Sequence, residues 1–286
     1  MSPARGAQAR LIVTADDFGA SPQVNEAVEH AFSHGILRAA SLMVAAPGRD
    51  DAVARARRLH GLRVGLHLVL VEGRALLPHA DLPDLTTPDG FFRRDMAAAA
   101  VDIFFRPAAR RQLLAEVRAQ FAAFAATGLP LDHVNTHKHF HLHPTIAGAI
   151  LKVGAEHGLA ASRAPVEPLS VLRAVDAAAT PRSAWLTDPW ARLVRARFRA
   201  RGVEVADQVF GLAWSGAMTP TRVAGLIRAL PPGLSELYTH PATSGGWEGE
   251  APDYRYAEEL EALTAPDVLA AVRERGAVLG GFTDFA

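Results

Sequence analysis

The sequence predicts an α/β fold, a single-domain (β/α) barrel-like sheet of about seven parallel strands that forms an incomplete or distorted barrel. Short apolar runs of strand length alternate with helical segments along the whole chain. Several runs are apolar at nearly every position, as in strands buried on both faces of a parallel sheet. No domain-scale linker, repeat or low-complexity segment divides the 286 residues. An open doubly wound sheet is the second interpretation, but the chain lacks a G-x-G-x-x-G motif after its first strand and a Walker A motif.

The first half of the chain follows this pattern after a loose leader over residues 1–9. Ser21 is a good helix N-cap, Pro22 suits the first helical position, and Gly35 provides a stop, which predicts a helix to about residue 34. Further helices are expected over residues 50–59 and 96–127, the second interrupted near Pro107. Strands are expected over residues 10–14, 39–46, 62–71 and 131–136.

The second half continues the alternation. Strands are expected near residues 160–163 and over residues 234–239 and 277–282. Helices are expected over residues 144–157, 189–201, 219–230, 254–263 and 266–275. Asp188 is a good N-cap for the second of these helices, and Pro189 suits its first position. Residues 164–188 give no clear pattern.

Composition restricts the class of function. Thirty basic and 30 acidic residues balance, so nothing in the net charge indicates nucleic-acid binding. The chain has no cysteine, so any metal must be held by nitrogen and oxygen ligands. The lack of cysteine, of a signal peptide and of a run long enough to cross a bilayer leads us to expect a cytoplasmic protein. Its oligomeric state is left open.

A histidine-rich segment follows the fourth predicted strand. Five of the 12 histidines lie in residues 133–143, and His137, His139, His141 and His143 occupy every second position. On extended chain this spacing places the four imidazoles on one face. Strand carboxyl ends carry the chemistry of α/β proteins, and imidazole is a common metal ligand and proton carrier. We therefore expect a metal or catalytic site rather than an exposed polar loop.

Other strand ends carry side chains that could converge on this segment. Asp16 and Asp17 end the first strand, where one carboxylate could bind a metal and the other could take a proton. Both reach one site only if the chain turns, which the following Phe-Gly-Ala allows. The alternative for either aspartate is a helix cap.

The remaining candidates are His67 on the third strand, His240 near the end of a late strand, and Arg163. Each histidine could instead be a neutral, hydrogen-bonded core residue. Arg163 would orient a carboxylate or ligand, or else lie on the surface.

These residues occur in motifs that resemble a known family. The motifs are Thr-Ala-Asp-Asp-Phe-Gly (14–19), Gly-Leu-His-Leu (65–68), His-Val-Asn-Thr-His-Lys-His-Phe-His (133–141), Tyr-Thr-His-Pro (238–241) and, more loosely, residues 159–163. Together they resemble the YdjC-like carbohydrate deacetylases, within the NodB-like group of metal-dependent polysaccharide deacetylases. Residues 40–44 and 68–73 are similar to the branch associated with hopanoid biosynthesis.

The resemblance implies a barrel-like fold and roles for individual residues. Asp17, His67 and His137 would hold one divalent metal ion, with Zn²⁺, Mn²⁺, Co²⁺ and Mg²⁺ all possible. Asp16 would be the general base and His240 the general acid. We place the other candidates, His139, His141 and Arg163, near the substrate. Other members can carry His at the position of Lys138, so a shared role is not assumed there.

The implied activity is removal of an acetyl group from an N-acetylated amino sugar, on a glycolipid such as an N-acetylglucosaminyl hopanoid. A metal-dependent phosphoesterase is one alternative, although no cluster of Lys and Arg at strand ends would clamp a phosphate. A non-catalytic sugar-binding protein is another, but it would not need both Asp16 and Asp17.

Two features bear on a lipid-linked substrate. Phe91, Phe92, Phe104 and Phe105 would contact an apolar aglycone, unless they belong to the core. The predicted 189–201 helix carries an apolar stripe of Trp190, Leu193, Val194 and Phe198, with arginines largely off it. Such a helix lies on an anionic membrane surface or packs as an outer barrel helix. The packing helix is the interpretation that we prefer, with peripheral membrane contact as its alternative.

Overall fold

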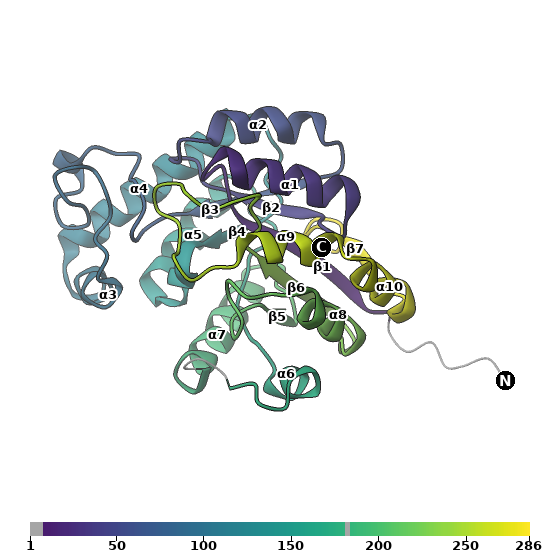
Figure 1. The fold of residues 1–286 in the computed structure, drawn as a ribbon. Coiled ribbons are helices and arrows are strands. Elements are labelled where there is room, and N and C mark those ends of the chain that lie inside the picture. Colours follow the sequence, from purple (N-terminus) through teal and green to yellow (C-terminus); the bar gives the residue numbers. More distant parts are fainter. Residues whose placement is uncertain (1–7, 181–183) are drawn as a thin grey trace.

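A computed structural model describes residues 8–180 and 184–286 as helices packed around one curled sheet (Figure 1). Every strand pair in the sheet is parallel. The strands are β1 (Arg10–Phe18), β2 (Ala39–Leu42), β3 (Arg63–Leu68), β4 (Val134–Thr136), β5 (Gln208–Phe210), β6 (Leu234–Thr239) and β7 (Val278–Gly280). The expected α/β class and the parallel, barrel-like sheet are therefore confirmed.

β1 is the central strand of the sheet. The strand order is β4-β3-β2-β1-β6-β5, and β7 also pairs with β1. Along β1, residues 10–15 pair with β6, residues 10–12 pair with β7, and residues 14–18 pair with β2. Leu11, Ile12 and Val13 are fully buried, which explains the continuous apolar run in the sequence.

The sheet curls into a distorted barrel rather than a regular one. Past β4, isolated parallel bridges join Val134 to Ser162 and Ala161 to Glu204. The segment from Glu204 leads into β5, whose Val209 donates a backbone hydrogen bond to Val166 (2.9 Å). Single bridges therefore span the gap between β4 and β5.

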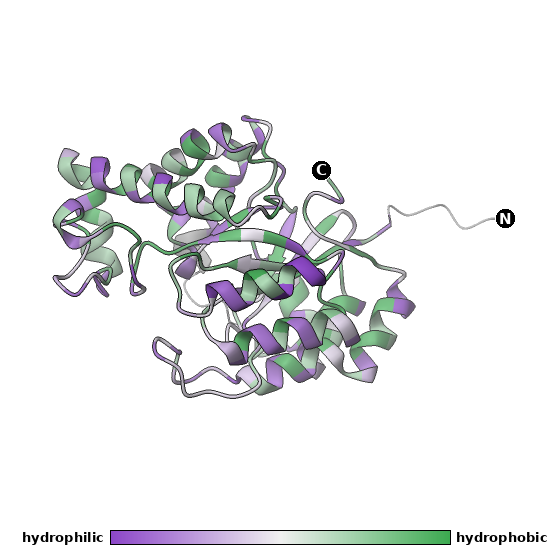
Figure 2. Cartoon of the chain, turned by 90° about the horizontal axis from the view of Figure 1, so that it is seen from above, coloured by the Kyte–Doolittle hydropathy of each residue, from purple (hydrophilic) through white to green (hydrophobic). Residues whose placement is uncertain are grey.

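Helices lie outside the sheet (Figure 1), with hydrophilic and hydrophobic residues alternating along them (Figure 2). They are α1 (Pro22–His34), α2 (Arg49–Arg58), α3 (Met96–Phe105), α4 (Pro107–Ala126), α5 (Pro144–Glu156), α6 (Leu169–Val175), α7 (Ala184–Arg199), α8 (Pro220–Arg228), α9 (Tyr256–Thr264) and α10 (Pro266–Arg275), with 3₁₀ helices η1 (His79–Asp81) and η2 (His137–Leu142). The expected caps of α1 are confirmed, because Ser21 accepts from the backbone of Val24 and Gly35 ends the helix. No helix in the described ranges is long and apolar enough to span a bilayer.

Some expected elements are wrong. The strand near residues 160–163 is reduced to isolated bridges, and β5 lies where no strand is predicted. The helix expected to start at Pro189 begins at Ala184, so Asp188 is not its N-cap. Pro189 lies inside α7, where its missing amide proton removes one helical hydrogen bond. Residues 1–7 of the expected leader fall outside the described residues.

Candidate active site

The carboxyl ends of β1, β3, β4 and β6 meet at one end of the sheet. The strand register pairs Ala15 with Thr239 and His67 with Asn135. The aspartates that follow Ala15 therefore lie beside the residue that follows Thr239, which is His240. Parallel pairing thus brings together the polar side chains of four strand ends, as expected from the sequence.

Three candidate metal ligands converge at this end. Asp17 Oδ1 lies 3.1 Å from His67 Nε2 and 3.4 Å from His137 Nδ1. The two nitrogens are 3.5 Å apart. The chain turns at Asp17 itself, whose φ is 62°, and through the expected Phe18-Gly19 step, where the φ of Gly19 is 94° and the Ala20 amide donates to the carbonyl of Asp17 (2.9 Å). This left-handed backbone lets Asp17 reach the histidines while Asp16 contacts other partners.

The hydrogen bonds behind His67 determine which of its nitrogens is free. His67 Nδ1 lies 2.7 Å from the amide oxygen of Asn135, an acceptor, so Nδ1 carries the proton. The Asn135 amide nitrogen donates to Asp16 Oδ1 (3.0 Å) and to Ser41 Oγ (3.1 Å), which fixes the orientation of the amide. His67 Nε2 therefore faces Asp17 and is the ring nitrogen that is available to a metal ion.

The three side chains fit a divalent metal ion. Their ligand atoms all lie within 4.8 Å of one another. Asp17 Oδ1 is buried and makes no aligned hydrogen bond with any described residue. One carboxylate oxygen and two imidazole nitrogens suit Zn²⁺, Mn²⁺ or Co²⁺, and they leave coordination positions for water and substrate. The donor set alone does not select among these ions.

Asp16 belongs to a buried charge network. Arg163 donates to both Asp16 oxygens, at 2.6 and 2.9 Å, and through Nε to Glu236 Oε1 at 2.9 Å. Arg163 is fully buried, so the surface alternative for it is wrong, and its contacts are those of a residue that orients a carboxylate. Burial raises the pKa of Asp16, but the charge and hydrogen bonds of Arg163, together with the charges of His67 and His240, outweigh burial and lower it. Asp16 is therefore ionised at neutral pH.

The histidine-rich segment is not extended. It forms η2, in which Lys138 (φ 53°) and His139 (φ 54°) have left-handed backbones. The prediction that four alternate histidines share one face is therefore wrong. Lys138 forms an ion pair with Glu72, whose φ is 63°. This contact ties the left-handed turn to the chain that follows β3.

Beyond His137, the alternate histidines have separate partners. His139 contacts Tyr238, His141 contacts Thr136, and His143 accepts from the backbone of Thr145 at the start of α5. His143 is therefore a helix cap, which the sequence analysis did not anticipate.

His139 and His141 are neutral and each keeps one free nitrogen. Burial lowers the pKa of both rings, and the charge of Arg163 lowers it further, to about 3 for His141. His139 Nδ1 and His141 Nε2 are buried without a hydrogen-bond partner in the described part of the chain. Both nitrogens are thus available to a polar ligand.

His240 is held by a buried carboxylate on α9. Glu259 Oε2 accepts a hydrogen bond from the His240 backbone (2.5 Å) and lies 3.9 Å from His240 Nδ1. Glu259 Oε1 accepts from the backbone of Met218 (2.9 Å). Burial raises the pKa of Glu259, against the opposing effect of His240. The imidazole also meets the rings of Tyr238 and Tyr254, at centroid distances of 5.7 and 4.9 Å.

Four supporting residues are absent from the sequence prediction: Ser41, Asn135, Glu236 and Glu259. The first three could have been noticed in the sequence, because each is a polar residue within a predicted strand, where a buried side chain is expected. The structure shows all three fully or almost fully buried. Glu259 gave no signal, because a glutamate on a helix is ordinarily solvated.

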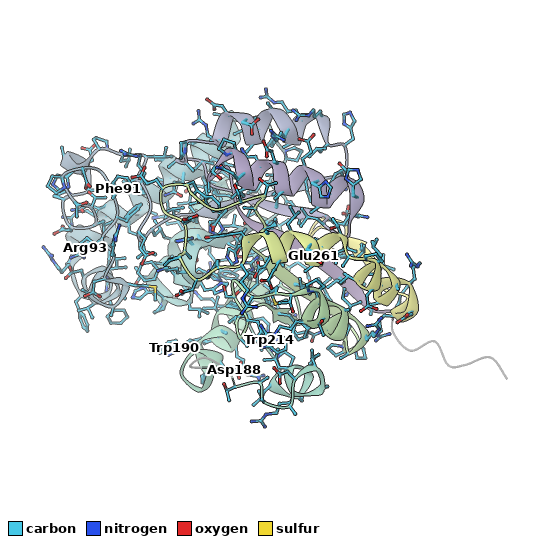
Figure 3. All side chains as sticks on the ribbon, in the orientation of Figure 1. Phe91, Arg93, Asp188, Trp190, Trp214 and Glu261 are labelled. Atoms are coloured by element: carbon cyan, nitrogen blue, oxygen red, sulfur yellow. The ribbon has the colours of Figure 1, made fainter. Side chains whose placement is uncertain are left out.

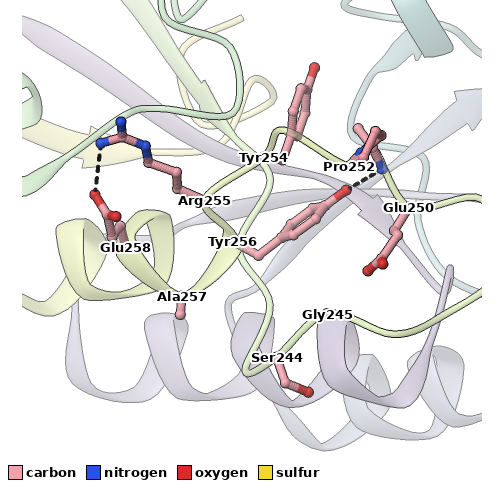
Figure 4. A pocket seen from close by; sticks show the side chains of 10 residues that line it. Ser244, Gly245, Glu250, Pro252, Tyr254, Arg255, Tyr256, Ala257 and Glu258 are labelled. Atoms are coloured by element: carbon pink, nitrogen blue, oxygen red, sulfur yellow. Dashed lines mark hydrogen bonds and ion pairs between the residues drawn. The ribbon is translucent and has the colours of Figure 1, made fainter.

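A cavity of about 330 Å³ lies next to this site, lined by residues of the 244–258 segment (Figure 4). Tyr254 and Tyr256 form part of its wall, and Glu250 and Arg255 lie around it. Because the Tyr254 ring contacts His240, the cavity adjoins the candidate acid.

Comparisons with known proteins find similar chains and folds. The model of the family described as "YdjC-like protein" matches residues 10–274. A carbohydrate deacetylase of Mus musculus is 32% identical over 308 residues, covering 96% of this chain and 94% of that protein. A chitooligosaccharide deacetylase of Serratia marcescens is 28% identical, covering 96% and 98%. A solved structure of an Enterococcus faecalis protein named for cellobiose-phosphate cleavage has a TM-score of 0.75 at 22% identity, covering 98% and 100%, and supports the fold.

Proposed function

The chain belongs to the YdjC-like protein family, and we propose that it is a metal-dependent hydrolase that removes the acetyl group from an N-acetylated amino sugar. The observation that carries the proposal is the convergence of Asp17, His67 and His137, in which His67 Nε2 and His137 Nδ1 both face Asp17 Oδ1. Relatives that align with nearly the whole chain are named carbohydrate deacetylases, which supports the substrate class.

The metal-binding role falls to Asp17, His67 and His137. A divalent ion bound there would polarise the acetyl carbonyl and lower the pKa of water from about 15.7 towards about 7. Asn135 keeps the imidazole of His67 in the tautomer that a metal ligand requires.

Asp16 and His240 are proposed to move the protons of the reaction. Water attacks the carbonyl carbon and gives a proton to Asp16, which is ionised because Arg163 lowers its pKa. His240 gives a proton to the nitrogen as the C–N bond breaks, so that acetate and a free amine are formed. Acid or base assistance of this kind contributes about 10² to 10⁴ in rate.

His139 and His141 are proposed to bind the substrate through their free, buried nitrogens. Arg163 acts on the substrate indirectly, because its guanidinium is occupied by Asp16 and Glu236. The same occupation argues against the phosphoesterase alternative, since Arg163 is not free to bind a phosphate.

We further propose that the sugar is carried on a glycolipid, such as an N-acetylglucosaminyl hopanoid. The sequence similarity of residues 40–44 and 68–73 supports this choice. Phe104 and Phe105 are 43% and 71% exposed and are available to an apolar aglycone. Phe92 is buried, so the core interpretation holds for it. The cytoplasmic location stays a prediction.

Mass spectrometry would test the function. The purified protein is incubated with an N-acetylglucosaminyl lipid and with chitobiose, each with Zn²⁺, Mn²⁺, Co²⁺ or Mg²⁺ added. We expect loss of one acetyl group with at least one ion, and a higher kcat/KM for the glycolipid. Equal kcat/KM for the two substrates would contradict the lipid preference. No turnover of any N-acetyl sugar, or release of phosphate from a phosphate ester panel, would contradict the deacetylase.

A further inference from the structure

Exposed large hydrophobic side chains are concentrated on two helices. Seven such residues occur in the described ranges, and the exception to the pattern is Val278 on β7. The other six are on α3 and α7: Met96 (41% exposed), Val101 (56%), Phe104 (43%), Phe105 (71%), Trp190 (50%) and Leu193 (54%). Isolated exposed apolar residues are ordinary, but a concentration on two elements indicates an interaction surface.

Both helices pack beside the segment that carries His137. The ring of Phe104 on α3 lies 5.9 Å from the ring of His143. Arg197 on α7 donates to the carbonyl of the next residue, Pro144, at 2.9 Å. The two helices therefore meet the chain at adjacent positions, just after η2, and Figure 1 shows both towards the lower left of the molecule.

The apolar residues of α7 divide into an inner and an outer set. Val194 and Phe198 are 3% and 0% exposed, so they pack inward as an outer barrel helix requires. Trp190 and Leu193 are half exposed, and Trp190 lies at the edge of the molecule in Figure 3. Packing into the core thus accounts for half of the stripe and leaves the outer half exposed.

Charge distinguishes this surface from the rest of the protein. Residues 93–111 and 188–201 contain ten of the 30 basic residues, all arginine, but three of the 30 acidic residues. Their formal charge is therefore ten minus three, or +7, and the ion pairs of Arg106 with Asp84 and of Arg199 with Asp207 reduce it by two, to +5, in a chain whose total is zero. Arg110 also stacks on Phe104, with 5.8 Å between the guanidinium carbon and the ring centre. Arginines beside exposed aromatic residues are typical of proteins that bind at a lipid headgroup boundary.

We propose that α3 and the outer face of α7 form a docking surface for an anionic lipid bilayer, which we call the α3–α7 surface. Opposite charge would draw it to the headgroups, and the six apolar side chains would enter the boundary with the acyl chains. A second copy of the chain is a poorer occupant, because a two-fold contact would set two arginine-rich surfaces of net positive charge against each other. Docking would help catalysis only if the substrate is the proposed glycolipid. Lipid binding by the surface does not depend on that substrate.

Co-sedimentation with vesicles tests the proposal. The full chain is mixed with vesicles of phosphatidylcholine, or of phosphatidylcholine with phosphatidylglycerol, at low and high salt. We expect binding to the anionic vesicles that weakens at high salt. The double variant Val101→Ser with Trp190→Ser should bind about tenfold less. Val278→Ser removes the exposed residue outside the surface and should bind like the wild type.

Three outcomes contradict the docking surface. The proposal is overturned by no binding to anionic vesicles at low salt, or by an equal loss in Val278→Ser and the double variant. It is also overturned if sedimentation velocity shows a dimer that the double variant dissociates while vesicles stay unbound. Turnover of soluble chitobiose reports on the proposed function separately, and we expect the double variant to retain it. Vesicle binding without any deacetylation would contradict the proposed function alone.

Discussion

His67 Nδ1 lies 2.7 Å from the amide oxygen of Asn135, and this contact connects the proposed metal ligands to the proposed base. The same amide donates to Asp16, so one side chain fixes the tautomer of His67 and binds the carboxylate of Asp16. We therefore expect Asn135, which is neither a proposed metal ligand nor a proposed proton carrier, to couple metal affinity to proton transfer.

Alanine at Asp17, His67 or His137 is expected to lower metal content and deacetylation together, because each removes one of three convergent ligands. Inductively coupled plasma mass spectrometry measures the bound metal. His34→Ala, at an exposed histidine, is the matched control and should change neither. Full occupancy in all three variants would contradict the ligand assignment.

Asp16→Asn and His240→Ala are expected to keep the metal and lose activity. Neither residue is in the ligand cluster, and each would remove one proton transfer, so kcat should fall by roughly 10² or more. Single-turnover deacetylation, measured alongside metal content, separates the two effects. A wild-type kcat for His240→Ala at every pH would assign the acid role elsewhere.

Glu259→Gln is expected to lower kcat with little change in KM. The substitution removes the negative charge 3.9 Å from His240 Nδ1 and leaves one acceptor where two backbone amides now donate. We expect a loss of about tenfold, together with a shift of the pH profile of kcat. Glu258→Gln, its exposed neighbour on α9, is the control. Identical pH profiles for wild type and Glu259→Gln would rule out a positioning role.

Arg163→Met is expected to destabilise the fold by about 3–5 kcal/mol, because Asp16 and Glu236 would be left buried without their counter-charge. Arg163→Lys should recover little, since an ammonium cannot donate to both carboxylates with the geometry of a guanidinium. Urea unfolding followed by circular dichroism measures the loss. Unchanged midpoints in both variants would show that the network does not stabilise the fold.

The free energy of unfolding is expected to decrease as the pH is lowered, because of His141. Its pKa is about 3 in the folded protein, against about 6.5 when unfolded. Between these values the unfolded chain binds a proton that the folded chain does not, so the stabilising contribution is complete above pH 6.5 and is lost as pH decreases towards 3. The expected slope approaches about 1.4 kcal/mol per pH unit. His141→Gln should reduce the slope between pH 7 and pH 5, and His34→Gln serves as the control; equal slopes would contradict the assignment.

Features that depend on the local pattern of residues were predicted correctly from the sequence. The apolar run of β1, the cap of α1 by Ser21 and the convergence of strand ends all follow from residue type and spacing. The bend at Lys138 and His139 was not predictable, because two non-glycine residues adopt left-handed backbones only when tertiary contacts hold them. Glu236 and Glu259 were missed because their partners are distant in sequence, as in the 3.1 Å contact of Thr14 with Glu236.

The position of β1 has a consequence for folding. It leaves the ribosome before the other strands of this sheet, yet β6 and β7, which pair with it, end at residues 239 and 280. Pairings so far apart in sequence form slowly, and an apolar strand that waits for its neighbours exposes backbone groups to other chains. The nascent protein must therefore keep β1 from misassembly until nearly the whole chain has been made.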